Sequence, residues 1–234
     1  SESNYEQTKK FYEESISLSR EIGLKRELAI SLFNLGDCVE NCDKNFEHAM
    51  EYFEESLALF REMGNKIGIA SSFYGIGNVL FRRSGMEDEA KTSYEIALTL
   101  FRESGNKNGI ANSLRGIGNV AFFLSEFTEA KKHFEESLEL RRETGDNENI
   151  AEALRSIGNV LSESGNHNQA LKFYKEALGL SLEMKNKSGI LSSLIGFTMV
   201  LSSDNHLSQA SQILGSVETA INTLSSGLGK IDLT

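Results

Sequence analysis

The sequence contains residue types that do chemistry in proteins, but their spacing supports no catalytic centre. The segment GIGN occurs at 75–78 and again at 116–119, where it could suggest a nucleotide-binding loop. Neither copy follows a predicted strand, and both lack the third glycine of a dinucleotide motif. Cys38 and Cys42 lie four residues apart, and two thiols without a further Cys or His nearby make a poor zinc site. We therefore predict neither a nucleotide cofactor nor a bound metal.

The histidines and carboxylates also form no catalytic or metal-binding pattern. The four histidines are His48, His133, His167 and His206, and no two of them have the spacing of metal ligands. Adjacent glutamates recur at 13–14, 54–55 and 135–136, but adjacent residues on a helix do not share a face. We expect these glutamates on a solvated surface, and Cys38 at a buried apolar position. No P-loop, HExxH or GxSxG motif occurs, so the sequence predicts that the chain is not an enzyme.

The composition narrows the class of protein. The chain has 234 residues, of which 39% are hydrophobic and 25% charged, as in ordinary folded domains. Proline is absent, which suits a nearly all-helical chain because proline removes a backbone donor and clashes with the preceding turn. The net charge of −10 disfavours nucleic acid, whose phosphates need Lys and Arg, and disfavours anionic membranes.

The location is predicted from what the chain does not contain. No apolar run approaches the roughly 20 residues that cross a bilayer. The first twenty residues are polar and amphipathic, with nothing like a secretory signal, and there are only two cysteines. We therefore expect a cytoplasmic protein that is not bound to a membrane.

An internal repeat organises the chain. Copies of one helical segment align without gaps and recur every 40 or 41 residues, beginning at Gly23, Gly64, Gly105, Gly145 and Lys185. A second segment follows each copy and carries apolar residues at helical spacing, such as Ala49, Phe53 and Leu57. The repeat is therefore a first helix, a short turn and a second helix, here called helix A and helix B.

This pattern predicts an all-α chain with about eleven helices in one solenoid domain over residues 1–234. The expected parts are a lone B helix at 4–22, repeats at about 24–63, 65–104, 106–144, 146–184 and 186–224, and a short tail at 225–234. The chain begins without Met, so we expect it to be a piece of a larger protein.

The repeats resemble the tetratricopeptide repeat (TPR) family over residues 4–224. The resemblance is carried by an apolar-Gly-Asn/Asp triplet in helix A and by a small residue and an aromatic in helix B. The triplets end at Asp37, Asn78, Asn119 and Asn159, the small residues are Ala49, Ala90, Ala130, Ala170 and Ala210, and the aromatics are Phe53, Tyr94, Phe134 and Tyr174. The long unit without proline is similar to the branch found in LGN/Pins, kinesin light chain and sensor regions of bacterial regulators.

The resemblance implies a right-handed superhelical solenoid of antiparallel helix pairs, with the A helices lining a concave groove. It places the last residue of each triplet in the groove, with Met199 breaking the series. Side chains on the same helical face complete the predicted binding site, which is Asp37, Tyr74, Asn78, Arg82, Arg115, Asn119, Phe122, Arg155 and Asn159. Further residues at these register positions are Glu40, Asn41, Phe81, Phe123, Ser162, Glu163 and Ile195.

The chemistry of this face suits an extended peptide. An Asn amide offers donors and an acceptor to a peptide backbone, and Arg pairs with carboxylates through two hydrogen bonds. The asparagines can equally serve helix packing alone, and the sequence leaves both roles open.

We therefore expect an interaction module or scaffold that binds a protein or peptide ligand in its groove, because solenoids present extended concave surfaces. One alternative is a ligand-sensing helical domain of a larger bacterial transcription regulator or signalling protein. A buried pocket ringed by aromatic side chains would favour that alternative over an open polar groove. Another is an architectural segment that self-associates through the open ends of the solenoid.

Overall fold

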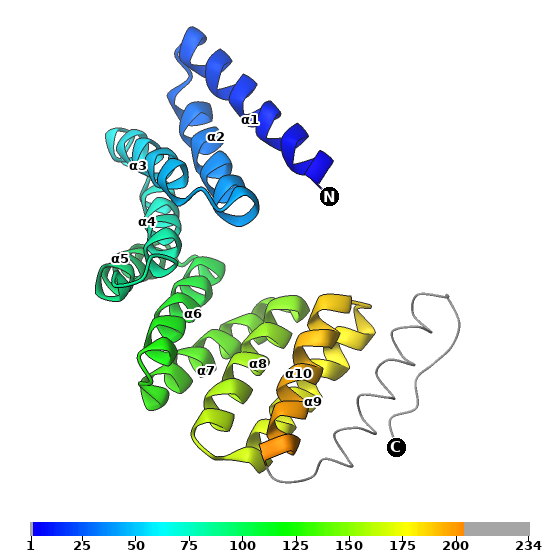
Figure 1. Cartoon of the computed structure of the whole chain (residues 1–234). Helices are drawn as coiled ribbons and strands as arrows, with labels where there is room; N and C mark the ends of the chain where they lie inside the picture. The colour runs from blue at the N-terminus through cyan, green and yellow to red at the C-terminus, as the bar shows by residue number, and fades with distance from the viewer. Residues whose placement is uncertain (1, 204–234) are drawn as a thin grey trace. The chain divides into compact units, whose positions relative to one another are not determined.

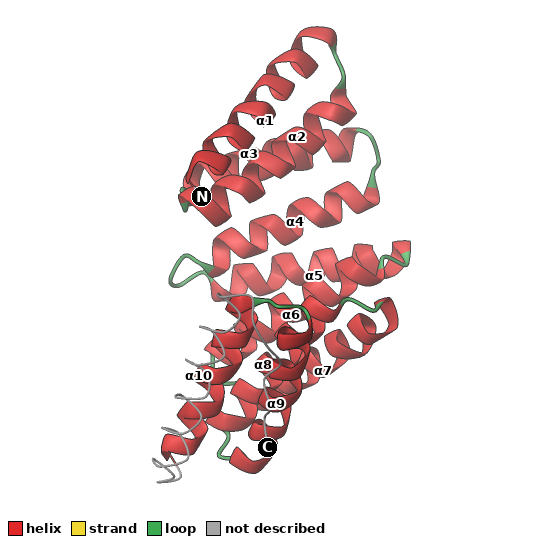
Figure 2. Ribbon diagram, turned by 90° about the vertical axis from the view of Figure 1, so that its right-hand side faces the viewer, coloured by secondary structure: helices red, strands yellow, loops and turns green. Residues whose placement is uncertain are grey.

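The computed structural model describes residues 2–203, and every regular element in this range is helical (Figures 1 and 2). The elements are α1 (Glu2–Ile22), α2 (Lys25–Cys38), the π-helical turn η1 (Val39–Asp43), α3 (Phe46–Glu62), α4 (Lys66–Phe81), α5 (Glu87–Ser104), α6 (Lys107–Phe123), α7 (Phe127–Thr144), α8 (Asn147–Glu163), α9 (His167–Glu183) and α10 (Lys187–Ser203). The chain divides into two compact units after Val120, within α6, and each unit is described by itself.

The helices follow the predicted order of the repeats, which confirms the all-α, TPR-like fold. Helix α1 is the lone B helix, the pairs α2–α3 to α8–α9 are four repeats, and α10 is the A helix of a fifth. Its predicted B helix, in the repeat ending at residue 224, and the predicted tail at 225–234 lie outside the described residues. The right-handed winding and the single domain stay predictions.

Helix packing within each unit brings the A helices together. In the first unit each helix from α1 to α5 contacts the next, and α2 also contacts α4. In the second unit α7, α8, α9 and α10 contact in sequence, and α8 also contacts α10, as Figure 1 shows. Since α2, α4, α8 and α10 are all A helices, A helices of neighbouring repeats lie side by side and share a face.

The helix ends are set by residues that recur with the repeat. The side-chain oxygens of Asn65, Asn106 and Asn186 accept hydrogen bonds from backbone N–H groups three residues later, at 2.9–3.0 Å, and so cap α4, α6 and α10. Gly145 ends α7 with a φ of 70°, a left-handed conformation that glycine adopts at little cost. Local sequence therefore positions each A helix relative to its B helix.

Each core aromatic of helix B packs against glycines of the A helices. Phe53, Tyr94 and Tyr174 are at most 2% exposed. A Cβ atom added to Gly75 would lie 2.6 Å from Phe53 Cε1, and one added to Gly116 would lie 2.7 Å from Tyr94 Cδ1. Real Cβ atoms do not approach this closely, so the glycines allow the helices to meet. This confirms the packing role of the GIGN segments.

The end of the first A helix departs from the repeat pattern. The π-helical turn η1 follows α2 directly, and Lys44 then takes a left-handed φ of 54°. A π turn inserts an extra residue into the helical ladder, which changes the register of the side chains that follow. Val39 and Glu40 are buried, at 2% and 1% exposure, whereas Cys38 is only half-buried. The prediction of a buried Cys38 was therefore wrong.

The outer surface carries exposed ion pairs that repeat with the unit. Lys25 pairs with Glu62 and Lys66 pairs with Glu103, each at 2.8 Å and at the same place in successive repeats. The adjacent glutamates at 13–14, 54–55 and 135–136 are exposed or half-buried, as expected. Exposed ion pairs contribute about 0.2–1 kcal/mol each, so the glycine and aromatic contacts dominate the packing.

Candidate binding face on the A helices

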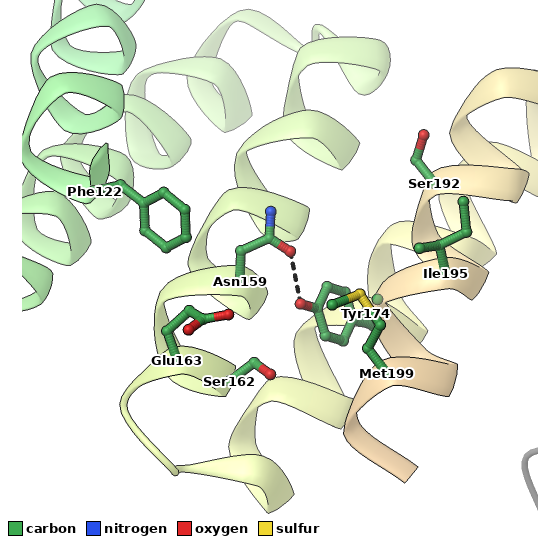
Figure 3. Close-up of a pocket in the computed structure, with 9 residues that line it drawn as sticks. Phe122, Asn159, Ser162, Glu163, Tyr174, Ser192, Ile195 and Met199 are labelled. Atoms are coloured by element: carbon green, nitrogen blue, oxygen red, sulfur yellow. Dashed lines mark hydrogen bonds between the residues drawn. The ribbon is translucent and has the colours of Figure 1, made fainter. Parts of the chain in front are cut away.

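A pocket opens on the A-helix face of the second unit (Figure 3). Its volume is about 360 Å³, and it is lined by Phe122, Asn159, Ser162, Glu163, Tyr174, Ser192, Ile195, Gly196 and Met199. All but one of these residues belong to the A helices α6, α8 and α10, and Tyr174 comes from the B helix α9. We call it the α8–α10 pocket.

The two main walls of the α8–α10 pocket differ in polarity. The α8 wall carries Asn159, Ser162 and Glu163, which are polar and at least partly exposed. The α10 wall carries Ser192 at one end but is mainly apolar, because Ile195 and Met199 are 51% and 60% exposed there. The pocket can therefore hold a molecule with a polar edge and an apolar edge.

A buried tyrosine fixes the orientation of the Asn159 amide. Tyr174 Oη donates a hydrogen bond of 2.7 Å to Asn159 Oδ1, and Tyr174 is only 2% exposed (Figure 3). Because the oxygen of the amide is engaged, its Nδ2 group points away from Tyr174, and Asn159 itself is exposed. Two N–H donors are therefore presented to a ligand from a fixed position.

Charges around this amide shift the pKa values of its neighbours. Burial and, to a smaller extent, the nearby Glu163 carboxylate together raise the pKa of Tyr174 to about 12, so the hydroxyl stays protonated and donates. Arg155 lies one helical turn before Asn159 and is half-buried. Burial lowers the pKa of Arg155, while Glu152 and Glu148 raise it. The α8 side of the face thus carries charges of both signs.

The first unit repeats the tyrosine–asparagine bond on a different helix pair. Tyr94 Oη, on α5, donates to Asn78 Oδ1, on α4, at 2.9 Å. The ring of Tyr94 lies 5.7 Å from the ring of Tyr74, whose hydroxyl accepts a 2.7 Å hydrogen bond from Arg115 Nη2. Side chains of α4, α5 and α6 are therefore linked across two repeats.

An ion pair with a buried carboxylate joins the first repeat to this group. Glu40 in η1 is 1% exposed, and its Oε1 accepts a 2.6 Å hydrogen bond from Nε of Arg82, the residue that ends α4. Burial raises the pKa of Glu40 above its ordinary value, while hydrogen bonds from Arg82 and Asn78 lower it. Arg82 remains partly exposed, so its guanidinium is held in place with surface left for a partner.

The predicted site residues separate between the two units. The first unit contains Asp37, Tyr74, Asn78, Arg82, Arg115 and Asn119, and the second contains Phe122, Arg155 and Asn159. Phe122 and Asn159 line the α8–α10 pocket, whereas Arg155 does not. Asp37 is exposed and accepts a hydrogen bond from Asn41, and Asn119 is half-buried. These positions describe where the residues lie, and their binding role stays a prediction.

Sequence reasoning missed the partners that orient these residues. Tyr94 and Tyr174 were expected only as core aromatics, and Glu40 only as a member of the polar face. One signal in the sequence could have found these hydrogen bonds. The same helix-B position alternates between Phe and Tyr, at Phe53, Tyr94, Phe134 and Tyr174, and only tyrosine has a hydroxyl that can donate a hydrogen bond to the last residue of the triplet.

The described residues offer no conventional metal centre or membrane anchor. Within 2–203, no group of three or more His, Cys, Asp or Glu gathers closely enough to hold a metal ion. No helix of this range combines the length and apolar character that a bilayer span requires. Cys38 and Cys42 are both free thiols.

The repeat geometry agrees with a known protein family. A tetratricopeptide repeat model matches residues 1–62, 68–143 and 109–183. The chain belongs to the tetratricopeptide repeat family. The comparison with curated proteins found no match.

Solved structures of similar fold include other TPR proteins. BtubC (BKLC) from P. vanneervenii is 16% identical, with 98% of this chain and 95% of that chain covered, at a TM-score of 0.79. A signal-transduction ATPase with a TPR sensor, from Pyrococcus horikoshii, is 13% identical, with 87% of this chain and 31% of that chain covered, at a TM-score of 0.71. A Rap protein complexed with Competence and Sporulation Factor is 13% identical, with 96% of this chain and 72% of that chain covered, at a TM-score of 0.72. At these identities the likeness shows the fold.

Proposed function

We propose that this chain is a non-catalytic interaction module that binds an extended peptide segment of a partner protein along its A helices. TPR repeats are typically protein-interaction modules, and the match covers most of the chain. A Rap protein of similar fold was solved in complex with Competence and Sporulation Factor, which is consistent with ligand capture by such a fold. The net charge of −10 argues for a protein partner rather than a nucleic acid.

The observation that carries the proposal is the exposed, oriented amide of Asn159 at the edge of the α8–α10 pocket. An extended peptide presents a carbonyl oxygen at every residue, and each can accept a hydrogen bond from Asn159 Nδ2 without regard to its side chain. The apolar α10 wall beside the amide can take a neighbouring side chain of the same peptide. Backbone and side-chain contacts therefore fit one ligand.

The proposal is tested by Asn159→Asp. The carboxylate keeps an acceptor for Tyr174 but removes both N–H donors, and Asp37 shows that Asp is accommodated at this register position. Peptides selected from a random displayed library with the whole chain would be synthesised and measured by calorimetry. We expect Asn159→Asp to bind them about tenfold more weakly, which corresponds to a loss of about 1.4 kcal/mol, with little change in the unfolding temperature.

Lys172→Ala supplies the matched control, because Lys172 is exposed on α9 and does not line the pocket. This variant should bind the selected peptides as the native chain does. Full binding by Asn159→Asp would place the ligand elsewhere on the molecule. Failure of the native chain to select any peptide would refute the proposed function itself.

The sensor alternative receives support from one feature of the pocket. Phe122 and Tyr174 bring two aromatic rings to a site of about 360 Å³, within the range of small-molecule sites. The three polar side chains of the α8 wall, which include the exposed Asn159 amide, are those of a polar groove rather than of a buried pocket ringed by aromatic side chains, and they favour an extended peptide. Thermal unfolding with a metabolite panel distinguishes the two, because a small ligand of this pocket would raise the unfolding temperature without any peptide.

A further inference from the structure

One register position on the A helices varies in charge from repeat to repeat. The residue four positions after the end of each triplet is Asn41, Arg82, Phe123 and Glu163 in turn, and Asn41 is the exception in structure because it lies in the π turn η1. The triplets themselves end in Asp37 and then in three asparagines, so the amide position is nearly constant while this neighbour changes from neutral to cationic, aromatic and anionic. A position with a nearly constant amide can bind the backbone of a ligand. A neighbouring position with a variable side chain then lets each repeat bind a different side chain of that ligand.

Glu163 is the member of this series that lines the α8–α10 pocket. It is exposed and forms no ion pair with any residue of the described range 2–203. Its counterpart Arg82 differs, because Arg82 is already held by the buried Glu40 at 2.6 Å. The Glu163 carboxylate is therefore available to a cation that enters the pocket.

A small residue makes room for a ligand next to Glu163. At the preceding register position the second and third repeats carry Phe81 and Phe122, whereas the fourth carries Ser162. The missing ring leaves space between the end of α8 and the apolar side chains Ile195 and Met199 of α10. In Figure 3, Ser162 lies between Glu163 on one side and Ile195 and Met199 on the other, so an apolar ligand side chain placed over Ser162 would have the carboxylate and the α10 wall on either side.

Tyr174 acts on the ligand through Asn159. Its ring lines the pocket but is only 2% exposed, so it offers a ligand little surface of its own, whereas its hydroxyl holds Asn159 Oδ1 at 2.7 Å and directs the Nδ2 donors outward. Without that bond the amide could rotate and offer its oxygen, which would repel a ligand carbonyl. Tyr174 is thus a positioning residue for the amide.

We infer that the α8–α10 pocket selects peptides in which a basic side chain neighbours an apolar one, with Glu163 as the specificity-determining residue and Tyr174 positioning Asn159. The inference rests on the proposed peptide-binding function and adds the chemistry of the ligand. Asn159 binds a main-chain carbonyl, Ile195 and Met199 contact the apolar side chain, and Glu163 pairs with the Lys or Arg.

The test uses the whole chain on an array of acetylated and amidated synthetic peptides. Each peptide contains one leucine and one charged residue, which is Lys or Glu. Across the array, the charged residue occupies every position relative to the leucine. We expect the native chain to retain the Lys peptides about fivefold better than the matched Glu peptides, the size of an exposed ion pair. Glu163→Arg, which installs the residue of the second repeat, should reverse the preference.

Tyr174→Phe separates positioning from charge selection. Phe occupies the same position at Phe53 and Phe134, so the variant should fold. We expect it to weaken binding of Lys and Glu peptides by the same factor, to keep their ratio, and to shift the side-chain amide NMR signals of Asn159. Unchanged amide signals and unchanged affinity would remove Tyr174 from the inference.

The outcomes distinguish this inference from the proposed function. Retention of Lys and Glu peptides to the same extent, or a preference that Glu163→Arg leaves unchanged, would overturn the role of Glu163 while peptide binding stands. Retention of no peptide would overturn both. Self-association of the native chain that Glu163→Arg abolishes would show that a second copy occupies the pocket, which also overturns the inference.

Discussion

At the residue scale, the packing of this chain depends on pairs of glycine and aromatic residues. Tyr94 lies against Gly77 of its own A helix and against Gly116 of the next, and Tyr174 does the same with Gly158 and Gly196. Each ring therefore sets the distance to two A helices at once. Protein interiors are packed as densely as organic crystals, so an added methyl group at such a contact has no free volume to enter.

Gly116→Ala tests this contact against a matched glycine. Its new Cβ would lie 2.7 Å from Tyr94 Cδ1, and we expect a loss of about 1–3 kcal/mol of unfolding free energy from overpacking. Gly179 lies exposed within α9, where a Cβ would meet nothing within 4 Å, so Gly179→Ala should gain up to about 1 kcal/mol from helix propensity. Denaturant unfolding measures both, and a Gly116→Ala variant as stable as the native chain would refute the contact.

At the element scale, the sequence predicts regular helices well and their irregular ends poorly. Periodic apolar positions and capping residues such as Asn65 and Asn106 determine where A helices begin, so the repeat alone locates them. The π turn η1 escapes prediction because Glu40 occupies a position where the next two repeats carry Phe81 and Phe122. Only the structure shows that Glu40 is buried against Arg82, a partner 42 residues away.

The charge of Glu40 makes this turn sensitive to pH. Burial raises the pKa of Glu40 above its ordinary 4.5 by more than Arg82 and Asn78 lower it. A carboxyl with a raised pKa favours the folded state below pH 4.5, and that contribution is lost as pH rises through the folded pKa. Glu40→Gln keeps an acceptor for Arg82 without the charge, so at pH 7 we expect an unfolding temperature about 2–4 °C higher.

The gain from Glu40→Gln should shrink as the pH falls towards 4, where the native carboxyl is itself protonated. Glu62→Gln is the control, since Glu62 belongs to an exposed ion pair with Lys25 and its replacement should give no such pH-dependent gain. Scanning calorimetry at several pH values measures both variants. A lower unfolding temperature for Glu40→Gln at pH 7 would mean that the ion pair with Arg82 outweighs the cost of burial.

At the scale of the whole molecule, the repeat explains which parts of the candidate binding face the sequence could predict. Translating one helix-A register along the chain selects Asn159 and Phe122, which line a pocket in the structure, because every copy of the repeat presents the same helical face. It could not find the α8–α10 pocket, which depends on three different A helices and on Ser162 being small. Nor could it assign the Asn159–Tyr174 bond, since Phe and Tyr are equivalent in a hydrophobic pattern but not in hydrogen bonding.

The same architecture predicts that damage stays local. Each repeat buries its faces mainly on its neighbours, so stability is approximately a sum of repeat and nearest-neighbour terms, and segments open with different free energies. Gly116→Ala disturbs Tyr94 in the first unit, and Gly196→Ala disturbs Tyr174 in the second. Hydrogen exchange with mass spectrometry measures the effect of each variant. We expect Gly116→Ala to speed amide exchange about tenfold in α4 and α5, and Gly196→Ala to do the same in α9 and α10. A tenfold change corresponds to a loss of about 1.4 kcal/mol in the free energy of local opening. The reciprocal design is its own control, because each variant reports on the helices that the other leaves intact. If either variant speeds exchange equally in all described helices, the chain unfolds as one cooperative body and the additive description of its repeats is wrong.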